Sequence, residues 1–152
     1  MMASKIVPVT AGQIRGNRKY NNKFDEHLGI KIADDFISSS KMSIATATPP
    51  DTAKNIHGVV HGGWTAALLD TVAGGTVHSH QPGSLENNEY ALTSSLTINY
   101  NLPVYAGNTY RCEGKITGRN GNNIETQATV IDDQGRSVAT AVALVKARTA
   151  QS

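Results

Sequence analysis

The chain has 152 residues, of which 39% are hydrophobic and 17% are charged, and its formal net charge is +2. This length and composition fit one globular domain with a sizeable core. The weak charge, without a block of Lys or Arg, argues against a nucleic-acid partner, and no apolar run is long enough to span a membrane. Cys112 is the single cysteine, which excludes an internal disulfide and fits a packed thiol rather than a nucleophile. Because the N-terminus also lacks the apolar core of a signal peptide, we expect a cytoplasmic protein.

The first half of the chain predicts a polar segment, two strands and one long helix. Residues 1–26 are polar and are expected to hold a loose surface helix. The stretches 28–38 and 41–48 are typical of strands, and the loop 49–55 carries two prolines, which cannot donate to a strand ladder. A long helix is expected from about residue 61 to residue 78.

A turn-rich loop at 81–88 and four strands complete the chain. The strands are separated by turns that contain glycine, and are expected at residues 89–102, 108–117, 124–132 and 137–147. The order predicts a single α+β domain over residues 27–149, with one helix packed against an antiparallel sheet of about six strands.

The first of these four strands alternates with a period of two. One face carries the apolar residues Leu92, Leu96, Ile98, Tyr100 and Leu102. The other face carries the polar residues Thr93, Ser95, Thr97 and Asn99. This alternation predicts a half-buried strand.

The long helix combines small residues with one acid. We expect its apolar face to pack on the sheet through Trp64, Leu68, Thr71 and Val72. Asp70 lies one turn from small residues, namely Ala66, Ala67, Ala73 and Gly74. Paired glycines cost helix stability, and the close approach of another backbone would explain Gly74 and Gly75. We therefore expect Asp70 at a contact surface or a cleft, although a solvated helix aspartate is the alternative.

The stretch HGG, residues 61 to 63, begins this helix and has two interpretations. A helix N-terminus has unpaired N–H groups at the positive end of its dipole, and glycine lets a ligand oxygen approach them. These groups stabilise a carbonyl oxygen that becomes an oxyanion. The alternative is that Gly62 and Gly63 only serve a tight turn from loop to helix.

His61 fits a structural role at the helix start as well as it fits catalysis. His57 lies four residues earlier, a spacing that a two-histidine metal site also uses. However, the intervening residues form a poor helix and no third ligand follows, so we expect no metal.

A resemblance appears in the stretch NIHGVVHGGWTAALLD. Its pattern N-x-x-G-x-x-H-G-G-x6-D resembles the signature of the hotdog-fold acyl-CoA thioesterases of the PaaI-like, or phenylacetic acid degradation, branch. The resemblance covers residues 27 to 147, including LGIKI, LTSSLTINYNLPVYAG and DQGRSVATAVALVK. It implies a long helix wrapped by an antiparallel sheet, assembly as a homodimer or homotetramer, and hydrolysis of an acyl-CoA thioester without a cofactor.

The resemblance also implies a role for each matching residue. Gly62 matches the backbone N–H that polarises the thioester carbonyl, and Asn55 matches the side-chain amide that assists it. Asp70 matches the carboxylate that acts as general base or nucleophile. His61 matches the residue that supports the thioester and leaving group, and Thr93 matches the hydroxyl that orients the water.

Spacing adds a further expectation about assembly. Gly62 and Asp70 are eight residues apart, roughly 12 Å along a helix, whereas a general base must lie within about 3 Å of its water. We therefore expect an obligate dimer in which Gly62 of one chain faces Asp70 of the other.

Strand alternation places Thr93 away from the apolar face, and a bulge near Leu92 would redirect it.

The substrate-binding residues expected are Gly63, Trp64, Arg119 and Lys146. Arg119 and Lys146 belong to a set of basic residues near the C-terminus, with Arg136 and Arg148, that would meet the CoA phosphates. Trp64, Leu68 and the loop 81–90 are expected to line a pocket suited to aryl or medium-chain acyl groups. The alternative functions are a hotdog hydratase, whose signature is absent, a dimeric scaffold, and a non-catalytic acyl-CoA binding or sensor module, which would need no base.

Overall fold

The computed structural model describes residues 23–32, 42–80 and 89–149. The elements in chain order are α2 (Lys23–Leu28), β1 (Ile30–Ile32), β2 (Met42–Ala47), the 3-10 helix η2 (Asp51–Ala53), α3 (Gly62–His80), β3 (Glu89–Tyr100), β4 (Tyr110–Asn120), β5 (Asn123–Ile131) and β6 (Ser137–Thr149). The earlier part of the expected surface helix, the end of the first expected strand and the loop 81–88 lie outside these residues.

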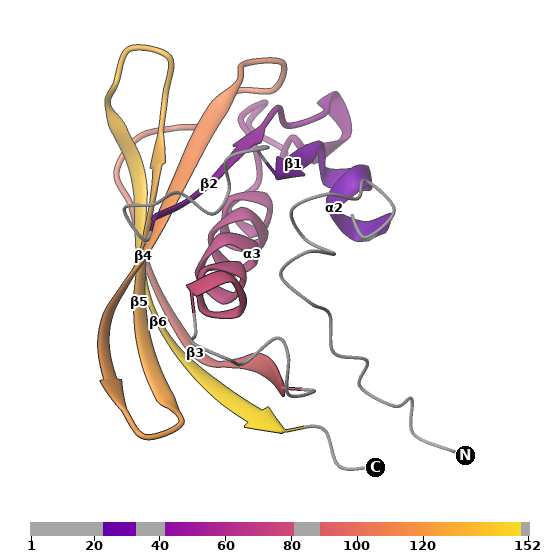
Figure 1. The fold of residues 1–152 in the computed structure, drawn as a ribbon. Coiled ribbons are helices and arrows are strands. Elements are labelled where there is room, and N and C mark those ends of the chain that lie inside the picture. Colours follow the sequence, from indigo (N-terminus) through magenta and orange to yellow (C-terminus); the bar gives the residue numbers. More distant parts are fainter. Residues whose placement is uncertain (1–22, 33–41, 81–88, 150–152) are drawn as a thin grey trace.

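The six strands form one antiparallel sheet that curls around α3 (Figure 1). The strand order is β1-β2-β4-β5-β6-β3. The strand β3 therefore lies at one edge of the sheet, beside β6 and not beside its chain neighbours β2 and β4. The short helix α2 lies on the side of α3 that faces away from the sheet (Figure 1). The expected α+β fold, with one long helix against about six antiparallel strands, is confirmed.

The β4–β5 hairpin is tighter than the sequence suggested. Asn120 pairs with Asn123, so the turn consists of two residues instead of the expected stretch 118–123. Gly121 has φ 61°, the left-handed conformation that two-residue hairpin turns require and that glycine adopts without strain.

The core lies between α3 and the concave face of the sheet. Leu68, Leu69, Val72 and Val77 of α3 are fully buried, as are Ile124, Val130 and Val145 of the sheet. Thr71 is an exception to the expected apolar face, because it points to α2 instead of the sheet. Its Oγ1 donates a hydrogen bond of 3.2 Å to Oδ1 of Asp25, a buried carboxylate of α2.

A bulge in β3 changes which residues face the helix. The register with β6 shifts between Thr93 and Ser95, so Ser94 is the extra residue. Before the bulge Thr93 pairs with the buried Val145, which places Thr93 on the concave face. Leu92 lies on the opposite, convex face and is 51% exposed. The expectation that Leu92 shares a face with Leu96 was therefore wrong, because simple alternation ends at Ser94.

A glycine of β4 lies close against the helix α3. A Cβ on Gly114 of β4 would lie 2.4 Å from Thr76 Oγ1 and 2.9 Å from Val72 Cγ1. At Gly74, which was expected to meet another backbone, a Cβ would meet only Thr93 Oγ1, at 3.9 Å. The contact that depends on glycine is therefore on β4.

We expect Gly114→Ala to lower the free energy of unfolding by about 1 to 3 kcal/mol, because the added methyl overpacks the helix–sheet contact. Chemical denaturation measures this change. Gly118→Ala is the matched control on the same strand, since its Cβ would meet Glu125 Cβ at an ordinary 3.7 Å. Equal stability of the two variants would contradict the close contact.

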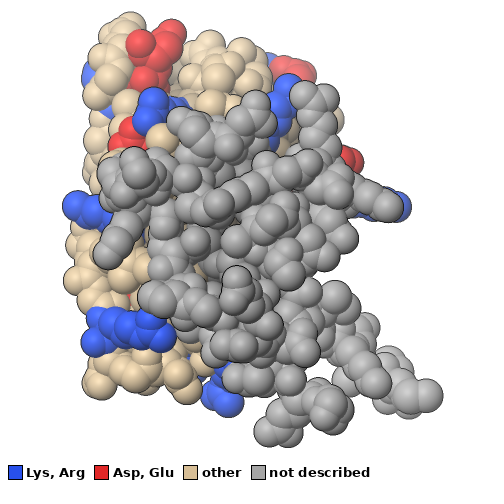
Figure 2. Space-filling view, viewed as in Figure 1, with Lys and Arg blue, Asp and Glu red and all other residues tan. Residues whose placement is uncertain are grey.

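Several surface and chemical features limit where a site can lie. Lys and Arg side chains are spread over the visible face in separate groups (Figure 2).

Cys112 is fully buried. Burial, followed by the charge of Glu113, raises the pKa of its thiol, so it is no nucleophile. Within the described ranges, no three His, Cys, Asp or Glu residues gather as metal ligands would, and no helix is long and apolar enough to cross a membrane.

Candidate active site

A closed loop precedes α3 and carries the first candidate residue, Asn55. Lys54 and Val60 form an antiparallel bridge across this loop. The N–H of Asn55 donates to Val59 O at 2.7 Å. The turn between them uses Gly58, whose φ of 80° favours glycine. The loop thus holds Asn55 close to the start of the helix.

The side chain of Asn55 has one end occupied and one end available. Its Oδ1 accepts a hydrogen bond of 2.8 Å from the backbone N–H of His57, a turn typical of asparagine. This bond orients the amide, so that Nδ2 remains as a donor. Asn55 is half-buried, so part of its side chain is accessible.

His61 caps the N-terminus of α3. Its Nδ1 accepts a hydrogen bond of 2.8 Å from Gly63 N–H, and its carbonyl accepts one of 2.9 Å from Trp64 N–H. The cap requires a neutral imidazole with its proton on Nε2. The structural role at the helix start is therefore present, and it leaves the exposed edge of the imidazole available for a second role.

Different neighbours limit the space at the two glycines of HGG. A Cβ on Gly63 would lie 3.0 Å from His61 Nδ1, so glycine there makes room for the cap. A Cβ on Gly62 would lie 3.3 Å from the ring of Tyr100. Among the described residues, none accepts a hydrogen bond from Gly62 N–H. The first N–H of α3 therefore has no partner in the described part of the chain, and it lies at the positive end of the helix dipole.

Tyr100 is a contact of this helix start that the sequence did not reveal. Its ring lies against Gly62, and its Oη donates a hydrogen bond of 3.0 Å to Gly62 O. Tyr100 is the last residue of β3 and is 56% exposed. Alternation in the sequence indicated only that Tyr100 lies on the apolar face. Its contact with Gly62 could not be predicted, because the two residues are 38 apart in the chain.

Asp70 and Thr93 form a second group, farther along α3. Thr93 Oγ1 donates a hydrogen bond of 2.7 Å to Asp70 Oδ1, and both side chains are exposed. The contact exists because the β3 bulge turns Thr93 toward the helix. The bulge near Leu92 that would redirect Thr93 is therefore present, at Ser94. The structure brings Asp70 and Thr93 together. It places Asn55 in the closed loop that leads to His61 and Gly62, at the start of the helix.

The two groups lie at different levels of the same helix. Gly62 is the first residue of α3, and Asp70 follows eight residues later, about 12 Å along the axis at the usual rise. A carbonyl bound at the Gly62 N–H is therefore out of reach of a water held by Asp70 in the same chain.

Arg119 and Lys146, the two basic residues expected to bind the CoA phosphates, lie on different faces of the sheet. The strand register places Arg119 on the face of Ile124 and Val145, and Lys146 on the opposite face. Arg119 Nε also donates to Gly121 O at 3.2 Å. One chain therefore does not bring Arg119 and Lys146 to a common phosphate.

The residues expected to line an acyl pocket do not all lie at one pocket. Leu68 is fully buried in the core and lines no surface. Trp64 is 4% exposed, and its Nε1 donates to Leu28 O at 2.7 Å. Trp64 and Gly63 do line one pocket together, beside α2. The loop 81–90 falls almost entirely outside the described residues.

The curled antiparallel sheet around one long helix defines a hotdog fold. The sequence model of the thioesterase superfamily matches residues 57–139, more than half of the chain, and the chain belongs to that superfamily. The matched range includes His61, Gly62, Asp70 and Thr93 but begins after Asn55 and α2. A comparison of the sequence with curated proteins finds no match.

Solved structures with the same fold include proteins of the PaaI type. The Escherichia coli PaaI protein from the phenylacetic acid degradation operon has 21% identity and a TM-score of 0.76, covering 93% of this chain and 95% of its own. A putative thioesterase of Ralstonia eutropha, related to phenylacetic acid degradation, has 24% identity and a TM-score of 0.72, with 90% and 97% covered. The smu.793 protein of Streptococcus mutans, bound to acetyl-CoA, has 22% identity and a TM-score of 0.64, with 74% and 85% covered. The PaaI-like hotdog resemblance is thus confirmed.

Proposed function

We propose that this protein is an acyl-CoA thioesterase that hydrolyses an acyl- or aryl-CoA thioester to the free acid and CoA. The observation that carries the proposal is the exposed Asp70 carboxylate, bound by Thr93 Oγ1, on a helix whose first N–H, that of Gly62, has no partner among the described residues. Membership of the thioesterase superfamily supports it, as does the acetyl-CoA bound to the Streptococcus mutans protein of the same fold.

The proposed chemistry divides the work between the two groups. Gly62 N–H and Asn55 Nδ2 donate to the thioester oxygen and stabilise the negative charge that develops there. Asp70 takes a proton from a water that attacks the carbonyl carbon, and the Thr93 hydroxyl orients the carboxylate and the water. The C–S bond of the resulting tetrahedral intermediate then breaks, and CoA leaves as its thiolate, which takes up the proton that Asp70 had accepted. In the alternative route Asp70 attacks directly, and water hydrolyses the resulting anhydride.

The proposed active form is a dimer with composite sites. Because about 12 Å of helix separates Gly62 from Asp70, the proposal takes each group from a different chain. The position of β3 at the sheet edge supports assembly, since a strand of 12 residues there offers backbone groups to a second copy. The exposed Gly63 and the half-buried Ala66 and Gly74 give the surface beside Asp70 little bulk.

CoA is proposed to lie on the surface with its phosphates near basic residues at the β4–β5 hairpin and β6. Because Arg119 and Lys146 lie on opposite faces of the sheet, a single chain is proposed to use only one of them for a given CoA. Charge reversal at each position, read out as KM for CoA esters, identifies which residue takes part.

The first test is thiol release from a panel of acyl-CoA esters running from acetyl to palmitoyl and including phenylacetyl and benzoyl. Turnover of at least one ester above the uncatalysed rate supports the proposal. If no ester is hydrolysed but acyl-CoA binds, the non-catalytic binding or sensor function is correct instead.

Removing the Tyr100 hydroxyl is expected to lower kcat by a modest factor. We expect Tyr100→Phe to lower kcat about 2- to 10-fold, the size of one net hydrogen bond, because the N-terminal turn that carries Gly62 loses an anchor. KM should change less than kcat. Tyr105→Phe is the control, since Tyr105 is similarly exposed, at 51%, and lies outside this contact. Equal kinetics of the two variants would remove Tyr100 from the site.

A further inference from the structure

The first turn of α3 begins with two consecutive glycines, Gly62 and Gly63. Glycine restricts the backbone less than any other residue, so two in succession leave this turn free to move unless other contacts hold it. The N–H of Gly62, which is the proposed donor to the thioester oxygen, belongs to this turn. The contacts that fix the turn therefore also fix the direction of that donor.

Both ends of the peptide unit between Gly62 and Gly63 are bound by a side chain. Its N–H, which belongs to Gly63, donates to His61 Nδ1 at 2.8 Å. Its carbonyl, which belongs to Gly62, accepts a hydrogen bond of 3.0 Å from Tyr100 Oη. A trans peptide unit is planar and its N–H and C=O point in opposite directions, so two contacts on opposite sides oppose its rotation. His61 and Tyr100 thus clamp this unit, one from the loop before α3 and the other from the end of β3.

The clamp acts on the Gly62 N–H through the preceding peptide unit, which contains the carbonyl of His61 and the N–H of Gly62. That carbonyl accepts a hydrogen bond of 2.9 Å from Trp64 N–H. This bond forms only when Gly62 and Gly63 have helical dihedral angles, which the clamp maintains. Trp64 is itself anchored, because its Nε1 donates to Leu28 O. With the His61 carbonyl directed to Trp64, the Gly62 N–H on the same unit points the opposite way, out of the helix start.

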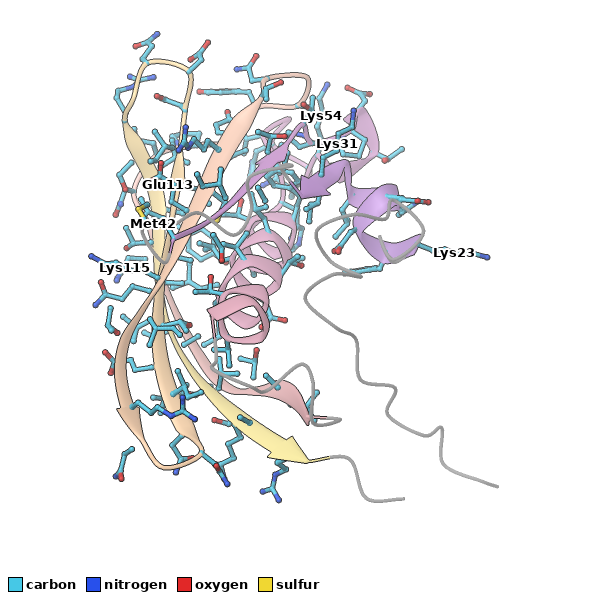
Figure 3. All side chains as sticks on the ribbon, viewed as in Figure 1. Lys23, Lys31, Met42, Lys54, Glu113 and Lys115 are labelled. Carbon is cyan, nitrogen blue, oxygen red and sulfur yellow. The ribbon has the colours of Figure 1, made fainter. Side chains whose placement is uncertain are left out.

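The clamp also keeps negative charge away from the helix start. A carboxylate at the N-terminus of a helix is a good cap and stabilises the helix, but the first turn of α3 contains no acidic residue. Asp51, the nearest carboxylate earlier in the chain, is paired with Lys54, which lies at the end of the molecule where α3 begins (Figure 3). An imidazole that accepts a hydrogen bond through Nδ1 is uncharged. It holds Gly63 without opposing the charge that develops on a thioester oxygen.

We propose that His61 and Tyr100 are positioning residues that clamp the Gly62–Gly63 peptide unit, and that His61 is an uncharged cap because a charged cap would oppose the reaction. The inference rests on the proposed thioesterase function. It assigns His61 an action through Gly62, in place of direct support of the leaving group. Both side chains are exposed, so each hydrogen bond alone is weak, and the position of the unit depends on the two together.

Substitutions at position 61 separate geometry from charge. His61→Ala removes the cap and should lower kcat about tenfold. Asn and Asp have the same shape and both cap helices, so His61→Asn should restore kcat to within about threefold of wild type. His61→Asp should have a kcat about tenfold or more below that of His61→Asn, because its charge repels the developing oxyanion. KM should change less than kcat in all three variants.

Thermal unfolding provides the contrast with a purely structural cap. His61→Asp should be at least as stable as His61→Asn, because an anion is favourable at a helix start, although it is the slower enzyme. Equal kcat of these two variants would overturn the uncharged cap. A kcat of His61→Asn as low as that of His61→Ala would show that the imidazole acts directly. His57→Asn is the control, since His57 is another exposed histidine of the same loop, and its kcat should stay within about twofold of wild type.

A double-mutant cycle tests whether His61 and Tyr100 hold one unit. In the variant with His61→Ala and Tyr100→Phe together, the loss of kcat should be about threefold or more below the product of the two single losses. The reason is that a unit released at one end gains little freedom from release at the other. His61→Ala with Tyr105→Phe is the control cycle, in which the losses should multiply to within about twofold. Losses that multiply in both cycles would overturn the clamp.

Amide hydrogen exchange, measured by NMR on the full-length protein, detects the clamp without catalysis. The Gly63 amide should exchange about 2- to 10-fold faster in His61→Ala and also in Tyr100→Phe, which leaves the imidazole acceptor in place. Equal exchange in wild type and in Tyr100→Phe would overturn the clamp even if the protein hydrolyses esters. Faster exchange in both variants, in a protein that turns over no ester of the panel, would support the clamp and reject the thioesterase function separately.

Discussion

Asp70→Asn is expected to lower kcat for thioester hydrolysis by about a hundredfold or more, because an amide cannot accept the proton from the attacking water. The substitution preserves shape, so Thr93 Oγ1 can still donate to the oxygen at position 70, at the 2.7 Å separation of the native pair. KM should change little, since the loss concerns the transition state rather than substrate binding. Initial rates on the best ester of the panel measure both parameters.

The matched control for this variant is Asp133→Asn. Asp133 is another exposed aspartate, in the β5–β6 turn away from α3, and its replacement should leave kcat within twofold of wild type. Thermal unfolding and dimer content are compared for both variants. Retention of more than about a tenth of wild-type kcat by Asp70→Asn would show that Asp70 is neither the base nor the nucleophile.

A heterodimer of two inactive variants is expected to recover about half of the wild-type activity. One chain carries Gly62→Ala, whose methyl crowds the Tyr100 ring and the approach to the N–H, and the other carries Asp70→Asn. If each site takes Gly62 from one chain and Asp70 from the other, one of the two sites in the heterodimer is intact and the other carries both substitutions. The measurement is kcat per heterodimer isolated with two different affinity tags.

The opposite result has an equally clear meaning. If Gly62 and Asp70 of the same chain form a site, every site in the heterodimer carries one substitution and activity stays as low as in the single variants. Asn55→Ala in place of Gly62→Ala repeats the experiment with a change outside the helix. A fully active monomer would also contradict the composite site.

The local patterns in the sequence were sufficient for the elements and for the main candidate residues. Turns that contain glycine are local signals, so β4, β5 and β6 follow from the sequence close to their expected ranges. The start of α3 at Gly62 follows from HGG, because glycines and a capping residue act within one turn. The superfamily motif, which is also local, indicated Asp70 and Gly62 together.

Contacts between distant segments required the tertiary structure. The bulge at Ser94 is a property of the pairing between β3 and β6, and it decides that Thr93 reaches Asp70. The contact of Tyr100 with Gly62 joins residues 38 apart, and nothing near either residue signals it. The assignment of Arg119 and Lys146 to opposite faces depends on register and on a second bulge in β4.

The sequence by itself thus determined the order of elements, the helix that carries the acid, and the candidate residues, because these depend on interactions within a few residues. The tertiary structure decided which residues meet: Thr93 with Asp70, and Tyr100 with Gly62. It also decided that Leu68 is core, while Trp64 is anchored to Leu28. The physical reason is that strand register, bulges and helix packing are set by the whole sheet and core together, and no short stretch of sequence contains them.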